Sequence, residues 1–85
     1  MVTGPTWFVA YDIPDDRVRT KVSELCLDKG LARVQYSCFL GQMSDAMARE
    51  LMLQCRRAVG RNPAHVILIP ICAKDLKKML SVRVA

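Results

Sequence analysis

The spacing of apolar residues changes repeatedly along this 85-residue chain. The segment WFVAYDI (7–13) is apolar at almost every position, a pattern typical of a central strand that is covered on both faces. Residues 15–29 instead place apolar residues at helical intervals, which predicts an amphipathic helix that Gly30 ends. A short chain that alternates between these two periods is expected to form a sheet with helices packed against it.

The second part of the chain repeats this change of spacing. LARVQYSCFLGQM (31–43) alternates apolar and polar residues, and its length predicts that it bends or divides into two strands near Ser37. Ser44 is expected to cap a second helix, HVILIPI (65–71) to form another strand, and residues 79–85 to form a short terminal strand. This order, β-α-β(β)-α-β-β, predicts an α+β fold: a ferredoxin-like sandwich with both helices on one face of an antiparallel sheet.

The sheet face away from the helices needs a cover in so small a protein. The alternation in residues 31–43 places Val34, Tyr36, Cys38 and Leu40 on one side, and Arg33, Gln35, Ser37 and Phe39 on the other. We assign the side with Phe39 to the open face. One domain that spans residues 1–85 is expected, and a second copy packed face to face would cover the open face of a homodimer.

The net charge of +5 is distributed unevenly along the chain. Residues 1–43 contain five acidic and five basic side chains, whereas residues 44–85 contain three acidic and eight basic ones. A basic surplus of this kind favours an anionic partner, with nucleic acid first among the candidates. Many basic small proteins bind no polyanion, so the charge leaves open a ferredoxin-like protein-interaction domain without a nucleic-acid function.

The four cysteines predict neither a zinc site nor a redox motif. Cys26, Cys38, Cys55 and Cys72 are widely spaced, and they are expected to be free, buried thiols in a reducing cytoplasm. No apolar run approaches the roughly 20 residues that a membrane span needs. We therefore expect a soluble, cytoplasmic protein with no membrane partner.

The first strand ends in a group of aspartates. Asp15 and Asp16 are explained as cap and dipole partners of the following helix. Asp12 has no such role, and a buried, unpaired carboxylate there would be costly. It is expected either to pair with an arginine or to hold a metal; one Asp12 per chain would suffice for Mg²⁺ if a two-fold axis brought two copies together. Such a site could polarise a phosphodiester and activate a water.

Other polar residues complete this hypothesis. Ser37 could hold a water or a phosphate oxygen, and Arg17, Arg19 and Arg33 could hold a nucleic-acid backbone. His65, the only histidine, heads an apolar strand and is interpreted as structural. The chain has no glycine-rich phosphate loop and no Ser-His or Cys-His arrangement, so nucleotide hydrolysis and acyl transfer lack support.

The segment YDIPDDRVRTKV, followed by KGLARVQYSCFLG and later by VILIPIC, resembles the CRISPR-associated protein two family, the small partner of the CRISPR spacer-acquisition integrase. The resemblance runs from about residue 7 to residue 72. It implies a ferredoxin-like homodimer in which the terminal strands, here residues 79–85, are exchanged or paired at the interface. The implied partners are the integrase subunit and double-stranded DNA or single-stranded RNA.

The resemblance also implies roles for individual residues. Asp12 matches the family's metal-binding aspartate, with Mg²⁺ as cofactor, and Asp12 and Ser37 match catalytic positions. The positions implied for nucleic-acid binding are Tyr11, Arg17, Arg19, Arg33 and Phe39. The implied functions are a scaffold for new spacer DNA in CRISPR adaptation and a magnesium-dependent endonuclease that acts on RNA or DNA. Cys38, Leu40 and the short tail depart from the family pattern.

Overall fold

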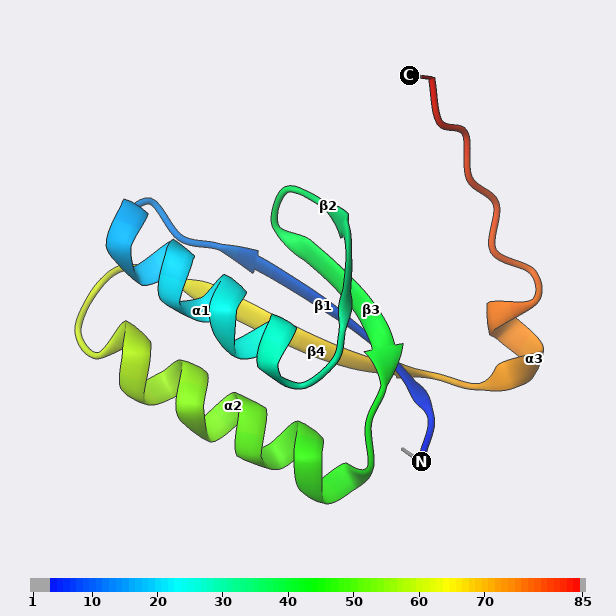
Figure 1. The fold of residues 1–85 in the computed structure, drawn as a ribbon, viewed down its shortest axis with the longest axis horizontal. Helices are drawn as coiled ribbons and strands as arrows, with labels where there is room; N and C mark the ends of the chain where they lie inside the picture. Colours follow the sequence, from blue (N-terminus) through cyan, green and yellow to red (C-terminus); the bar gives the residue numbers. More distant parts are fainter. Residues whose placement is uncertain (1–3, 85) are drawn as a thin grey trace.

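The computed structural model describes residues 4–84. Its elements in chain order are β1 (Thr6–Asp12), α1 (Asp16–Asp28), β2 (Ala32–Gln35), β3 (Cys38–Gln42), α2 (Asp45–Val59), β4 (His65–Ile71) and α3 (Ala73–Leu76). The strands form one antiparallel sheet in the order β2-β3-β1-β4, and α1 and α2 lie side by side on one face of it (Figure 1). This arrangement confirms the predicted α+β, ferredoxin-like fold.

Helix α1 begins and ends within one residue of the bounds that its sequence predicts. The Asp15 side chain accepts a hydrogen bond of 3.0 Å from the backbone N–H of Val18 and so satisfies one free donor of the first turn. The helix buries Val22 and Cys26 against the sheet. Gly30 follows with φ = 82°, a left-handed conformation that favours glycine and stops the helix.

The two faces of β1 carry different chemistry. Val9 on β1 pairs with Phe39 on β3; both are fully buried beneath the helices, and Tyr11 stacks on Phe39 with ring centres 6.2 Å apart. Since side chains alternate along a strand, Phe8 and Asp12 lie on the open face. The predicted position of Phe39 on the open face is therefore wrong.

That error has a physical cause. Both sides of residues 31–43 carry apolar side chains, so the alternation alone does not say which side meets the helices. In the structure Phe39 fills the core, and it is the side with Val34 and Leu40 that lies on the open face. Strands β2 and β3 separate at Tyr36 and Ser37, which confirms the predicted division near Ser37.

Gly41 allows a close approach between β3 and the segment that leads into β2. A Cβ atom at this position would lie 2.7 Å from Leu31 Cδ2 and 3.1 Å from Leu31 Cα. Leu31 is buried in the core, so it has little room to give way. The glycine is thus required by packing and not by its backbone angles.

The cysteines divide into two groups. Cys26 and Cys55 are buried, and burial raises the pKa of Cys26 to about 12 and that of Cys55 to about 11, so both stay protonated and unreactive at neutral pH. Cys38 is partly buried and Cys72 is exposed. The prediction of buried thiols is therefore right for Cys26 and Cys55 and wrong for Cys72.

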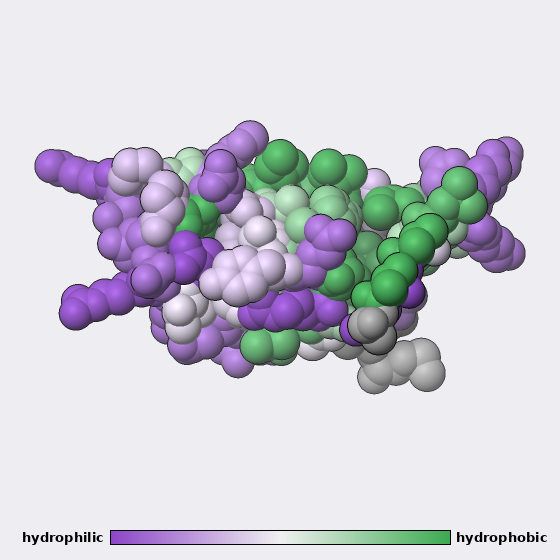
Figure 2. Space-filling model, turned by 90° about the horizontal axis from the view of Figure 1, so that it is seen from above, coloured by the Kyte–Doolittle hydropathy of each residue, from purple (hydrophilic) through white to green (hydrophobic). Residues whose placement is uncertain are grey.

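The open face and the C-terminal segment expose many apolar side chains. Ile67 and Ile69 of β4 are 39% and 46% exposed, and Leu80 and Val82 are 94% and 92% exposed. Hydrophobic side chains accordingly gather on one side of the folded body and along the extended C-terminal segment (Figure 2). Within residues 4–84, no helix is long and apolar enough to cross a bilayer.

The predicted terminal strand is absent from the single chain. Residues 79–84 form no strand, and the short helix α3 precedes them; Ala85 lies outside the described residues. A segment becomes a strand only by hydrogen bonding to a sheet edge, and residues 79–84 pair with neither edge strand of the sheet, β2 or β4. Pairing of residues 79–85 with a second copy stays a prediction.

Candidate metal and nucleic-acid site

Asp12 is the last residue of β1 and lies exposed on the open face. The ion pairs found among residues 4–84 join Arg19 to Asp16 and Lys29 to Glu50, so neither involves Asp12. An ion pair between Asp12 and an arginine, one of the two alternatives that the sequence left open, is therefore not found among these residues. A carboxylate left free in this way can accept a cation.

Antiparallel pairing sets the surroundings of Asp12. On one side, the N–H of Tyr11 donates to the carbonyl of Ser37 over 3.1 Å, which holds the β2–β3 turn against the end of β1. On the other side, Asp12 lies directly opposite His65, the first residue of β4. A shallow hollow of about 170 Å³ lies between them, lined by Ala10, Tyr11, Asp12, His65 and Ile67.

These residues fit a divalent cation only in part. Mg²⁺ commonly takes one or two protein carboxylates and keeps several waters, and Asp12 offers one unpaired carboxylate. Across residues 4–84, no three potential ligands of the His, Cys, Asp or Glu type gather at one place. A cation at Asp12 would need water or a second copy of the chain to complete its coordination.

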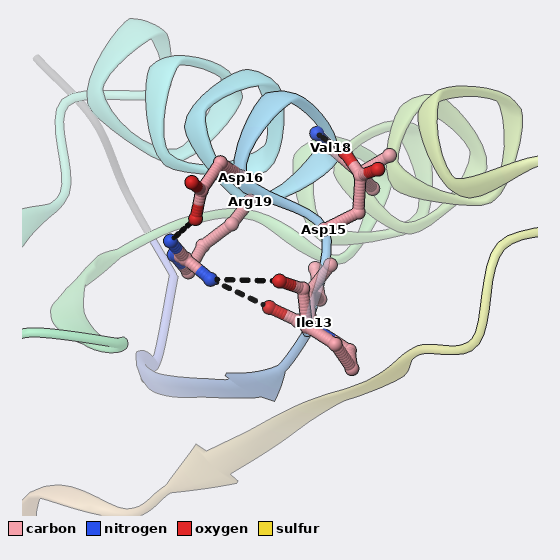
Figure 3. Close-up of polar contacts among 6 residues, drawn as sticks. Ile13, Asp15, Asp16, Val18 and Arg19 are labelled. Atoms are coloured by element: carbon pink, nitrogen blue, oxygen red, sulfur yellow. Dashed lines mark hydrogen bonds and ion pairs between the residues drawn. The ribbon is translucent and has the colours of Figure 1, made fainter.

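Arg19 holds the loop between β1 and α1 (Figure 3). Its Nη1 donates to the carbonyl of Ile13 over 2.9 Å and to that of Pro14 over 3.3 Å, while Nη2 pairs with the Asp16 carboxylate. The hydrogen bond to Asp16 is the main reason why the pKa of Arg19 is raised. Arg19 therefore stays charged and fixed at the end of β1.

Arg33 on β2 joins the sheet to α1. Its Nη2 donates to the Ser23 hydroxyl and its Nη1 to the carbonyl of Tyr36. The guanidinium carbon lies 4.8 Å from the centre of the Phe39 ring, a cation–π contact. The guanidinium of Arg33 thus packs on the buried ring, and its positive charge lies at the surface beside α1.

A cleft of about 160 Å³ opens between α1 and the β2–β3 turn. The residues that line it are Tyr11, Arg19, Thr20, Ser23, Arg33 and Tyr36. The Tyr11 hydroxyl is buried and finds no hydrogen-bond partner of good geometry among the described residues. Burial raises the pKa of Tyr11, while Ser23 and Arg33 lower it, so the phenol stays a hydrogen-bond donor at neutral pH. Guanidinium and hydroxyl donors around one cleft suit an oxyanion such as phosphate.

The family of the chain follows from its sequence. The model of the family described as CRISPR associated protein Cas2 matches residues 6–79. The chain belongs to the Cas2 family. The resemblance stated from the sequence motifs is confirmed.

Relatives of known name agree with this membership. The chain is 44% identical over 77 residues to the protein named CRISPR-associated endoribonuclease Cas2 from Desulforudis audaxviator, across 91% of this chain and 73% of that protein. It is 31% identical over 74 residues to a protein of Thermoproteus tenax named CRISPR-associated endonuclease Cas1/endonuclease Cas2 fusion, across 87% of this chain and 28% of the fusion. The crystal structure of Streptococcus pyogenes Cas2 at pH 6.5 superposes with a TM-score of 0.75 at 19% identity, over 92% of this chain and 99% of that one, and shows the shared fold.

The structure of this Cas2-family chain divides the site residues expected from the sequence between two faces. Asp12 lies on the open face, whereas Tyr11 and Arg33 border the cleft on the helix side. Phe39 is 0% exposed, which contradicts its expected contact with nucleic acid: the ring is part of the core and reaches the surface only through Arg33. Arg17 is exposed on α1.

Sequence reasoning missed the neighbour of Asp12. The sequence indicates a structural role for His65, yet the residue is exposed and lies directly opposite Asp12 in the sheet. In an antiparallel pair whose strands end flush, the last residue of one strand lies opposite the first residue of the other, but the order of elements did not specify that β1 and β4 pair in this way. Only the register of β1 with β4 was needed to find the pair.

Proposed function

We propose that this Cas2-family protein is a homodimeric nucleic-acid-binding scaffold of CRISPR adaptation and a metal-dependent endonuclease acting on RNA or DNA. The observation that carries the proposal is the free Asp12 carboxylate at the edge of an uncovered apolar sheet face, in a chain of this family. The relative from Desulforudis audaxviator is named an endoribonuclease, which supports the hydrolytic activity.

The open face supports the homodimer. Phe8 and Ile69 are cross-strand neighbours on it, and Leu40 lies beside them on β3. Burying an apolar face of this kind against a second copy would stabilise the dimer, by roughly 25 cal/mol for each Å² of apolar surface removed from water. A second copy packed around a two-fold axis would cover the same face in both chains and bring the two Asp12 side chains to one side of the assembly.

In that dimer, Asp12 of each chain would hold a divalent cation, with Mg²⁺ as the expected one. The cation would supply Lewis-acid stabilisation for the charge that develops on a phosphodiester. Asp12 would hold the cation at the end of β1. Ser37, whose backbone carbonyl accepts a hydrogen bond from the N–H of Tyr11, would position a phosphate oxygen.

The basic residues would bind the nucleic-acid backbone. Arg19 and Arg33 line the cleft, and each guanidinium has five N–H donors, so the observed hydrogen bonds leave donors free for a phosphate. Helix α2 adds exposed arginines, Arg56 and Arg57, in its last turn. Contacts of this type grip phosphates without reading sequence, as a scaffold requires.

The integrase subunit is the protein partner in this proposal. The Thermoproteus tenax relative is named as a fusion of the endonucleases Cas1 and Cas2 in one chain. A fusion of this kind supports an association between the two proteins. The exposed apolar segment at residues 79–84 is the first surface to test for this contact or for pairing with a second copy.

Cleavage tests the role of Asp12. With Mg²⁺ and matched single-stranded RNA and double-stranded DNA, the Asp12→Asn protein should lose about 100-fold or more of the cleavage rate, because an amide carries no charge to hold the cation. Chelation by EDTA should abolish cleavage by the wild type. The matched control is Asp28→Asn, an exposed aspartate at the far end of α1, which should cleave like the wild type. Undiminished cleavage by Asp12→Asn would remove Asp12 from the mechanism.

Binding to duplex DNA tests the scaffold against a protein-interaction domain. If phosphates are the main contacts, the affinity should fall by roughly 10²- to 10³-fold between about 50 and 200 mM salt. Replacing Arg56 by glutamine should lower the slope of log K against log salt by about 1, independently of the DNA sequence. Weak binding without salt dependence would favour the interaction domain.

A further inference from the structure

His65 and Asp12 share one edge of the sheet. Asp12 ends β1 and His65 begins β4, and the two residues are direct cross-strand partners. Residues directly opposite each other in an antiparallel pair have side chains on the same face, with Cβ atoms about 4.5–5.5 Å apart. A carboxylate and an imidazole at this separation can reach the same ion.

The immediate surroundings leave both groups free. The hollow between them holds about 170 Å³ and is open to solvent, and the other residues that line it are Ala10, Tyr11 and Ile67. Both Asp12 and His65 are exposed, so both side chains are accessible to water and to an ion from solution. Among the described residues, the hydrogen bonds found for side chains and the ion pairs do not engage either group.

A carboxylate and an imidazole together favour transition metals over Mg²⁺. Carboxylates and water suit Mg²⁺, whereas an imidazole nitrogen suits first-row transition metals, whose affinity for such a donor rises from Mn²⁺ through Co²⁺ to Ni²⁺. A site with one carboxylate alone would not discriminate strongly between Mg²⁺ and Mn²⁺. A site that adds an imidazole shifts the preference toward the transition metals.

We propose that His65 is a second protein ligand of the cation held by Asp12, so that this protein binds Co²⁺ and Mn²⁺ more tightly than Mg²⁺. The inference rests on the proposed metal role of Asp12, and it assigns to His65 the choice of metal. A histidine placed there makes the site of this chain a mixed nitrogen and oxygen site.

Calorimetric titration of the full chain with Mg²⁺, Mn²⁺ and Co²⁺ tests the proposal. The wild type should bind Co²⁺ most tightly and Mg²⁺ least tightly. His65→Gln should lose affinity for Co²⁺ on the order of tenfold to 100-fold and keep its affinity for Mg²⁺ within about twofold. His65→Asn is the second variant, should the glutamine protein fail to fold, and Asp28→Asn is the control with unchanged binding.

The outcomes separate this proposal from the one on which it rests. If His65→Gln binds all three ions like the wild type while Asp12→Asn binds none, His65 is no ligand and the Asp12 site stands. If Asp12→Asn binds like the wild type, or the wild type binds no ion, both proposals are overturned.

A second measurement needs no variant. His65 is the only histidine, so the ring protons of one imidazole form a single set of NMR signals. Mn²⁺ added in small amounts should broaden these signals before those of other side chains, and Mg²⁺ should leave their widths unchanged. Sharp His65 signals at Mn²⁺ concentrations that broaden other resonances would overturn the proposal.

Discussion

Arg33 connects the core to the candidate nucleic-acid surface through one side chain. Its guanidinium donates to Ser23 on α1 and to the carbonyl of Tyr36, and it lies on the buried Phe39 ring. Lysine offers one compact ammonium in place of a planar fork, so it cannot make both hydrogen bonds and the stacking contact together. Its contacts, and not its charge or exposure, distinguish Arg33 from other exposed arginines such as Arg17.

Arg33→Lys should therefore lower the free energy of unfolding by about 1–2 kcal/mol, through the lost hydrogen bonds. Urea denaturation at a fixed protein concentration measures the change. Arg17→Lys is the matched control, because Arg17 is exposed on α1, and it should stay within about 0.5 kcal/mol of the wild type. An equal effect of both substitutions would mean that Arg33 has no structural role.

The entry into α1 is fixed at two points. Asp15 caps the first turn through Val18, and Arg19 ties the same turn to the carbonyls of Ile13 and Pro14 (Figure 3). The end of β1, and with it Asp12, is thus held in a constant position relative to α1. A site at a strand end depends on such support because the chain leaves the sheet there.

Asp15→Ala should cost about 1 kcal/mol of stability, because the N–H of Val18 loses its acceptor and the helix dipole its partner. Thermal and urea unfolding measure the loss. Asp28→Ala removes the same charge from the opposite end of α1, where a carboxylate is unfavourable, and should be neutral or slightly stabilising. If the two variants lost the same stability, the cap would not explain the effect of Asp15.

Local signals predicted the elements well. The sequence predicts the first helix over 15–29 and the structure has it at Asp16–Asp28, because its cap, its apolar stripe and its terminal glycine all lie within one continuous segment. The face occupied by Phe39 and the meeting of Asp12 with His65 depend on strand pairing between distant segments, and a single segment does not encode them. A strand at 79–85 likewise depends on pairing with a distant sheet edge, and residues 79–84 pair with neither β2 nor β4 in the single chain.

For the whole molecule, the exposed apolar surface is the feature that most needs a partner. Ile69 on the open face is 46% exposed and Leu53 on α2 is 48% exposed, so the two are equal in accessibility and differ in location. Ile69 lies beside Phe8 in an apolar face, whereas Leu53 stands on a helix rich in charged side chains. We therefore expect the proposed second copy to pack at Ile69 and not at Leu53.

Ile69→Glu should convert the proposed dimer into a monomer, because the interface would have to bury an unpaired carboxylate, at a cost of about 2 kcal/mol or more. Leu53→Glu should leave the dimer intact. Sedimentation velocity over a range of concentrations distinguishes the two. A dimer that survives Ile69→Glu and dissociates with Leu53→Glu would place the interface on the helices.

Neighbouring residues of β1 serve opposite sides of the sheet: Tyr11 points into the cleft and Asp12 onto the open face. Inserting or deleting one residue within this strand would exchange the two, sending a carboxylate into the core and a phenol out of it. The length of β1 is therefore as tightly constrained as the identity of its last residues, and change at this strand has to proceed by substitution.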